Sequence, residues 1–208
     1  MKKLGIAGWV MALAFAAGSV MAAPPVAAPA LATVTPADHV LGSPKARVTI
    51  IEYGSVACPA CAQFNETVMP QLKAKYIDTG KVRYIFRPML TGVGTIAVAG
   101  TRLAECAGKD KYFAVIDAMM RGQKEYYAWG ESNIIARPVL AKIAQSFGFD
   151  EAAFNACAGD ANGLRQLQDQ HAAALEAGVR STPTIYVNGK VIERHELADI
   201  EAAIAAAK

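Results

Sequence analysis

Cysteines are the residues of this 208-residue chain whose type and spacing most readily do chemistry, and there are four of them. Cys58 and Cys61 are separated only by Pro59 and Ala60, so they lie one helical turn apart if a helix begins there. Two thiols at that spacing can interconvert between a dithiol and a small disulfide ring. We interpret them as a redox-active pair, with Cys58 as the nucleophile and Cys61 as the resolving thiol.

The segments on either side place this pair at the junction of a strand and a helix. Residues 47–53 are a β-branched apolar run that predicts a buried strand, and after the pair apolar residues recur every fourth position from Phe64 to Tyr76, as in a helix. Pro59 suits the first turn of that helix, and Pro70 predicts a kink midway. The unpaired N–H groups and the positive dipole end of a helix start favour the thiolate of Cys58.

A lone C-x-x-C motif has other interpretations, and these stay open. It can be half of a zinc site, although His39, His171 and His195 are scattered and none pairs closely with another cysteine. It can be a structural disulfide, although so short a loop gives little stabilisation. A copper-binding protein with soft sulfur ligands is the alternative from another functional class, and the lack of a Met-rich or His-rich tract argues against it.

The N-terminal region predicts export. Residues 1–22 have a basic start, an apolar run over residues 4–20 and small residues ending at Ala22, which is the pattern of a secretory signal. We expect cleavage after about Ala22 and a periplasmic product, with an uncleaved membrane anchor as the alternative. Residues 23–37 are rich in Ala and Pro and predict an extended leader, so the folded domain is expected to begin at Asp38. An oxidising compartment favours disulfide chemistry.

The remainder of the chain predicts an α/β fold with a four-stranded mixed sheet and helices on both faces. A second strand is expected over 81–87, and helices over 93–107, 110–124, 137–147, 151–158 and 161–177 form a helical insertion at about 91–178. A hairpin with an Asn-Gly turn follows over 183–193, and a helix over 196–207 closes the chain. Tyr126, Tyr127 and Trp129 are interpreted as core residues of the insertion. The formal net charge is +3 and the sequence contains no run of basic residues, which argues against nucleic-acid binding.

The other two cysteines lie near the ends of two predicted insertion helices. In a secreted chain, a structural disulfide between Cys106 and Cys157 is favoured, and closing a loop of that length stabilises a fold by about 4 kcal/mol. Two alternatives remain: buried free thiols, or a second redox pair that passes electrons to Cys58.

These features together resemble a known family. The strand, Cys58-Pro59-Ala60-Cys61 and helix, the long helical insertion, and the segment Val179-Arg180-Ser181-Thr182-Pro183-Thr184 resemble the DsbA-like thiol:disulfide oxidoreductases of the thioredoxin superfamily, from about Asp38 to the C-terminus. Residues 38–45 resemble the lead-in of the BdbD-like branch. The resemblance implies a thioredoxin fold that carries the helical insertion.

The resemblance also implies roles for single residues. Pro183 matches the cis-proline beside the active-site disulfide, and Thr182 matches the residue whose backbone pairs with the substrate peptide, where a plain turn is the alternative. Glu52 matches the buried acid that exchanges a proton with Cys61, unless its side chain faces outward. Ala60 stands where DsbA carries a histidine that stabilises the thiolate, so we predict a less oxidising disulfide than that of the strongest oxidants.

The activity that the resemblance implies is oxidation of exported proteins. We expect a monomeric enzyme that introduces disulfides into unfolded or reduced secreted polypeptides, needs no organic cofactor or metal, and is reoxidised by a membrane quinone-linked partner resembling DsbB. A disulfide isomerase or reductase on the same fold is the alternative. Isomerases of the DsbC type carry a separate dimerisation domain, and residues 23–37 are too few to form one.

Overall fold

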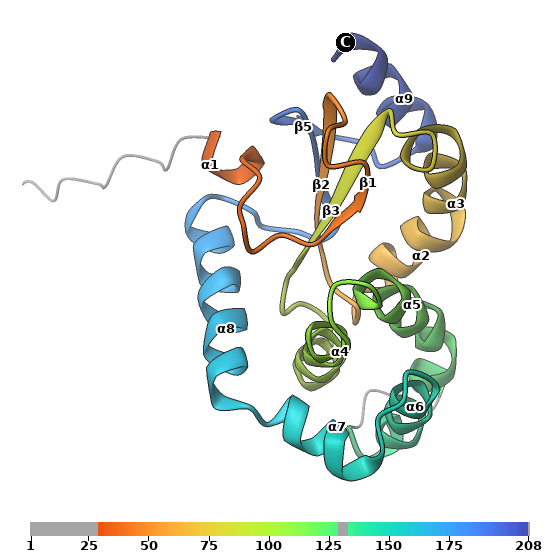
Figure 1. Cartoon of the computed structure of the whole chain (residues 1–208), viewed down its shortest axis with the longest axis vertical. Helices are drawn as coiled ribbons and strands as arrows, with labels where there is room; N and C mark the ends of the chain where they lie inside the picture. Colours follow the sequence, from red (N-terminus) through yellow and green to blue (C-terminus); the bar gives the residue numbers. More distant parts are fainter. Residues whose placement is uncertain (1–28, 129–132, 208) are drawn as a thin grey trace, which may run out of the picture.

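A mixed sheet of five strands forms the centre of the protein in the computed structural model, which describes residues 29–128 and 133–207 (Figure 1). Its spatial order is β1-β3-β2-β4-β5, with only β2 and β3 parallel. The strands are β1 (Val40–Gly42), β2 (Val48–Gly54), β3 (Val82–Pro88), β4 (Thr184–Val187) and β5 (Lys190–Ile192). The predicted signal segment and Trp129 lie outside the described residues.

The strand β1 is the one addition to the predicted four-stranded sheet. It pairs antiparallel with the edge of β3, with Val40 opposite Ile85. It is only three residues long, so it has too few positions for an alternating apolar pattern to show in the sequence. Its place in the sheet follows from pairing with β3.

The reactive motif begins the helices that cover one face of the sheet. These are α2 (Pro59–Thr67), α3 (Met69–Leu72), a π-helical turn (Lys73–Ile77) and, from the end of the chain, α9 (Leu197–Ala206) (Figure 1). The helix breaks at Val68, two residues before Pro70, which has no N–H to continue the hydrogen-bond ladder. Apolar side chains of these helices pack on β2, β3 and β4; they include Phe64, Leu72, Ile200 and Ile204.

The insertion between β3 and β4 is helical within the described residues. It comprises α4 (Gly94–Ala107), α5 (Tyr112–Ala128), α6 (Asn133–Ser146), α7 (Glu151–Ala158) and α8 (Ala161–Glu176). The helix α6 starts earlier than the predicted residue 137, so Pro138 lies inside it. Across residues 29–128 and 133–207, no helix is both long enough and apolar enough to cross a bilayer.

The other face of the sheet is covered by α8 and by the end of the expected leader (Figure 1). Here the structure differs from the predicted extended segment, because α1 (Pro29–Ala32) forms a helical turn and Leu31 is buried against β2 and β3. Arg87 donates to the carbonyl oxygens of Leu31 (2.8 Å) and Thr33 (2.6 Å) and forms an ion pair with Asp38. Packing therefore begins before Asp38.

Candidate active site

The structure places Cys58 at the junction that its sequence position predicts. The strand β2 ends at Gly54, a short buried loop follows, and Cys58 is the extended N-cap residue of α2 with Pro59 in the first turn. Pro59 and Ala60 are exposed, whereas Cys61 is fully buried one turn further on. Both thiols are free, so this is the reduced form of the pair. The sulfur that a large substrate can reach is that of Cys58.

The two sulfurs have opposite proton affinities. The Cys61 thiol donates to the Cys58 sulfur, and with smaller contributions from Thr182 and the N–H groups of Ala60 and Cys61 it lowers the pKa of Cys58 to about 5. The same hydrogen bond, together with burial, raises the pKa of Cys61 well above its usual range. The helix start thus contributes to thiolate stabilisation, but the neighbouring thiol contributes more. Cys58 is a thiolate at neutral pH and Cys61 is a thiol.

The loop before β4 lies directly beside Cys58. The peptide bond between Thr182 and Pro183 is cis, Pro183 is buried, and the Cys58 sulfur lies 3.4 Å from the Thr182 carbonyl oxygen. The Thr182 hydroxyl is 2.7 Å from that of Thr91, whose carbonyl accepts a hydrogen bond from the Ser55 hydroxyl at 2.8 Å. These contacts join three loops around the reactive sulfur.

Glu52 lies beneath this site and faces inward. It is 1% exposed on β2, and the hydroxyl of Tyr84 donates to its Oε2. Burial raises the pKa of Glu52 to about 7, while the Tyr84 hydrogen bond opposes part of that rise. A Cβ on Gly54 would lie 2.6 Å from the Glu52 Oε1, so the glycine leaves the space that the carboxyl group occupies. Glu52 can therefore gain or lose a proton near neutral pH.

Three further residues touch the loop before Cys58, and the sequence did not single them out for that role. Gln123, Tyr126 and Tyr127 of α5 each donate to backbone carbonyls of residues 56–58. The two tyrosines do pack in the insertion as core residues, as their sequence position predicts, and their hydroxyl groups in addition bind the loop. His171 is likewise in contact with a loop near the site, because its Nδ1 accepts from the Leu90 N–H at 3.3 Å.

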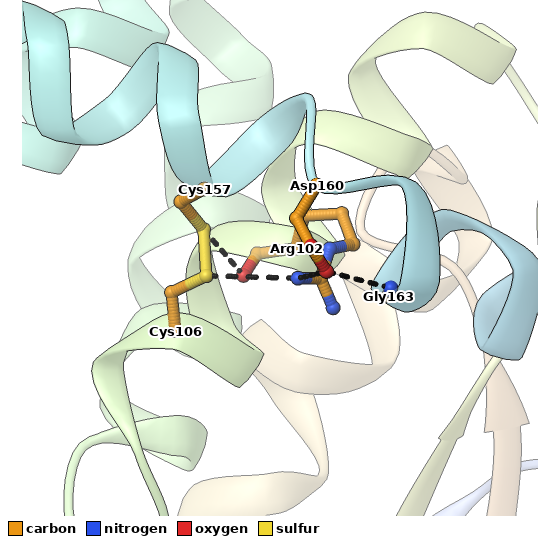
Figure 2. Close-up of a disulfide and its surroundings, with 5 residues drawn as sticks. All are labelled: Arg102, Cys106, Cys157, Asp160 and Gly163. Carbon is orange, nitrogen blue, oxygen red and sulfur yellow. Dashed lines mark hydrogen bonds and ion pairs between the residues drawn. A yellow bond between two sulfur atoms is a disulfide. The ribbon is translucent and has the colours of Figure 1, made fainter.

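Cys106 and Cys157 form a disulfide between α4 and α7, with an S–S distance of 2.08 Å (Figure 2). The guanidinium group of Arg102 lies beside it and pairs with Asp160, whose carboxylate also accepts from the Gly163 N–H at 2.7 Å and so caps α8 (Figure 2). This cluster ties three insertion helices together. Its residues lie in the insertion, separate in sequence from Cys58 and Cys61.

Among residues 29–128 and 133–207 there is no group of three or more His, Cys, Asp or Glu side chains that could hold a metal ion.

The structure combines a thioredoxin fold and a helical insertion with a C-x-x-C motif at a helix start and a cis-proline loop beside that motif. This combination defines a class of thiol proteins. The sequence profile of a thioredoxin family matches residues 34–206. The chain belongs to the thioredoxin family, in its DsbA-like group.

Solved structures and curated relatives agree with this assignment. The crystal structure of alpha-DsbA1 from Wolbachia pipientis superposes with a TM-score of 0.75 at 27% identity, covering 86% of this chain and 95% of that one. Oxidised BdbD from Bacillus subtilis shares the fold, with a TM-score of 0.70 at 24% identity over 82% of this chain and 92% of that one. A Rickettsia prowazekii relative with protein-disulfide oxidoreductase in its name is 29% identical over 80% of this chain. The chain spans 60% of the length of that relative.

Proposed function

We propose that this protein is an exported thiol:disulfide oxidoreductase that introduces disulfide bonds into secreted proteins through Cys58 and Cys61. The observation that carries the proposal is the pairing of an accessible sulfur, whose pKa is lowered to about 5, with a buried sulfur whose pKa is raised. A low-pKa thiolate is a good leaving group and stabilises the reduced form, which makes the corresponding disulfide oxidising.

The reaction consists of two thiol–disulfide exchanges. A substrate thiolate attacks the Cys58 sulfur of the oxidised enzyme, a mixed disulfide forms, the Cys58–Cys61 bond breaks, and its electron pair leaves on Cys61. Cys61 takes up a proton, and the buried Glu52 carboxyl group, which interacts electrostatically with Cys61 and has a pKa of about 7, can supply it. A second substrate thiolate then attacks the first substrate sulfur, which releases Cys58 as a thiolate and leaves the substrate oxidised and the enzyme reduced.

Recognition of unfolded or reduced polypeptides fits the loop beside Cys58. The backbone of Thr182 precedes the buried Pro183, so an extended substrate segment can pair with it as an added strand while its cysteine reaches Cys58. The reduced enzyme must pass two electrons onward, and we propose a membrane quinone-linked partner resembling DsbB. Export rests on the signal pattern of residues 1–22, with cleavage after about Ala22 and a periplasmic location.

Oxidation of a reduced substrate tests the proposal against isomerisation. The oxidised protein should speed disulfide formation in reduced, unfolded ribonuclease and should not restore activity to scrambled ribonuclease, and Cys58→Ser should abolish the first activity. Because Ala60 replaces the histidine of DsbA, we expect a reduction potential between those of DsbA and thioredoxin, roughly −120 and −270 mV. Rescue of the scrambled substrate, or a potential below that of thioredoxin, would overturn the assignment as an oxidase.

A further inference from the structure

We infer that Gln123 of α5 is a positioning residue for Cys58, and that with Tyr126 and Tyr127 it fixes the active-site loop to the helical insertion. The inference deepens the proposed function and rests on it, because it concerns how the reactive thiolate is held. By this inference the helical insertion takes part in the chemistry of the site, although α5 lies far from Cys58 along the sequence.

Gln123 makes two hydrogen bonds to the loop. Its Nε2 donates to the carbonyl oxygen of Val56 at 2.8 Å and to that of Cys58 at 3.1 Å. The side chain is buried, with the residue 4% exposed, so solvent cannot substitute for either contact. One amide group therefore spans the residues on both sides of Ala57.

The two tyrosines complete the contact. Tyr127 donates to the Ala57 carbonyl oxygen, and the Tyr126 hydroxyl lies 2.8 Å from the Val56 carbonyl oxygen and 2.9 Å from that of Met119. Three successive carbonyls before α2 thus have donors from one helix. All these donors are neutral, so they direct the loop without adding a charge that would change with pH.

The orientation of the Gln123 amide group is forced by its surroundings. Its Oε1 is buried and has no hydrogen-bond partner among the described residues. Turning the amide group over would satisfy nothing and would bring Oε1 against two carbonyl oxygens. A buried acceptor left unpaired is costly, so the two donor contacts must outweigh that cost for the arrangement to persist.

The geometry links these contacts to the sulfur. The Cys58 carbonyl also accepts the first hydrogen bond of α2, from the Ala62 N–H at 3.1 Å. Holding that carbonyl fixes the peptide plane between Cys58 and Pro59, and with it the direction in which the next N–H groups point. The N–H groups of Ala60 and Cys61 are the backbone donors to the Cys58 sulfur. Gln123 therefore acts on the thiolate through the first turn of α2.

Two substitutions of Gln123 test this role. Gln123→Met keeps the length of the side chain and removes both donors, and Gln123→Glu places a carboxylate against the carbonyls. We expect the pKa of Cys58 in the reduced protein to increase in the order wild type, Gln123→Met, Gln123→Glu. At about pH 4 the alkylation rate of Cys58 should fall about fivefold in Gln123→Met, the loss expected from one net hydrogen bond. Thiolate absorbance against pH, with alkylation located by mass spectrometry, measures both.

Control variants distinguish an effect of Gln123 on the position of Cys58 from an effect on stability. They also distinguish failure of this inference from failure of the proposed function. Gln63→Met, the same change at an exposed glutamine of α2, should leave the pKa of Cys58 unchanged. If the Gln123 variants do not fold, Tyr127→Phe removes one hydroxyl from the Ala57 carbonyl and should raise the same pKa. Variants that melt at lower temperature with an unchanged Cys58 pKa would overturn the inference. A wild-type Cys58 that is protonated at neutral pH would instead contradict the proposed function.

Discussion

Two sulfur atoms one helical turn apart differ in their proton affinity because they differ in burial and in hydrogen-bond direction. Cys61 is fully buried and donates, while Cys58 is partly exposed and accepts. Glu52 adds a third titratable group, which burial keeps from ionising until the pH approaches 7. At the residue scale, the site is a set of neighbouring groups among which one proton can move.

The buried carboxyl group of Glu52 should make stability depend on pH. Its pKa rises from 4.5 to about 7 on folding, so the cost of ionising it is absent below pH 4.5 and complete above pH 7. Glu52→Gln removes that cost, and its free energy of unfolding relative to the wild type should increase by about 3 kcal/mol across this range. Urea unfolding of the reduced proteins at several pH values measures the difference.

The prediction concerns how the difference in the free energy of unfolding between Glu52→Gln and the wild type changes with pH. The absolute difference is not predicted, because burying a glutamine has its own cost. Glu66→Gln, on the exposed side of α2, is the matched control. A difference that stays constant between pH 4.5 and 7 would show that folding does not raise the pKa of Glu52.

At the element scale, a disulfide and an ion pair join three helices of the insertion, and α5 fixes the insertion to the active-site loop. The Cys106–Cys157 disulfide joins α4 to α7, and the Arg102–Asp160 pair extends the connection to the start of α8 (Figure 2). A Cβ on Gly163 would lie 1.9 Å from the guanidinium carbon of Arg102, so this close approach requires glycine. The helix α5 makes the contacts with the loop before Cys58.

The disulfide should contribute to stability without setting the potential of the reactive pair. Replacing both Cys106 and Cys157 by alanine should lower the free energy of unfolding by about 4 kcal/mol, because the bond closes a loop with a sequence separation of 51. The reduction potential of the Cys58–Cys61 pair should stay as in the wild type. Guanidinium unfolding and equilibration with glutathione buffers test the two parts, and a changed potential would show that the Cys106–Cys157 disulfide alters the relative stability of the oxidised and reduced forms of the reactive pair.

At the scale of the whole molecule, a segment before the predicted domain closes the second face of the sheet. Leu31 joins the apolar cluster that includes Tyr53, Ile85 and Tyr186, and Arg87 binds the backbone of this segment and Asp38. The Arg87 side chain is 16% exposed and that of Asp38 is 7% exposed, so the pair is shielded from water. The described chain therefore has two apolar clusters, one on each face of the sheet.

Arg87→Met should release this segment. It removes the donors to Leu31 and Thr33 and leaves the buried Asp38 carboxylate without its cationic partner and with only the hydrogen bonds from Thr35, for which a loss of about 3 kcal/mol is expected. Thermal unfolding and limited proteolysis of residues 29–38 report the two effects. Arg83→Met is the control, because Arg83 on the same strand binds Thr49 and the Pro44 carbonyl instead. Equal protease resistance in wild type and Arg87→Met would contradict the proposed attachment.

Local patterns in the sequence predicted the elements with strong periodicity. The strands β2, β3, β4 and β5 and the insertion helices begin and end within a few residues of their predicted bounds, and the C-x-x-C motif lies at the start of α2. Elements that depend on pairing or packing were not predicted. The strand β1 is too short to show a pattern, and the turn around Leu31 forms only where an apolar cluster receives it.

The atoms that can react follow from local sequence, because the type and spacing of Cys58 and Cys61 place two thiols one turn apart at a helix start. Their different proton affinities required the tertiary structure, since these depend on the burial of each sulfur, on the hydrogen bond between the two sulfurs and on Thr182, which is far away in the chain. Hydrogen bonds and desolvation act over a few ångströms in space, whatever the separation along the chain.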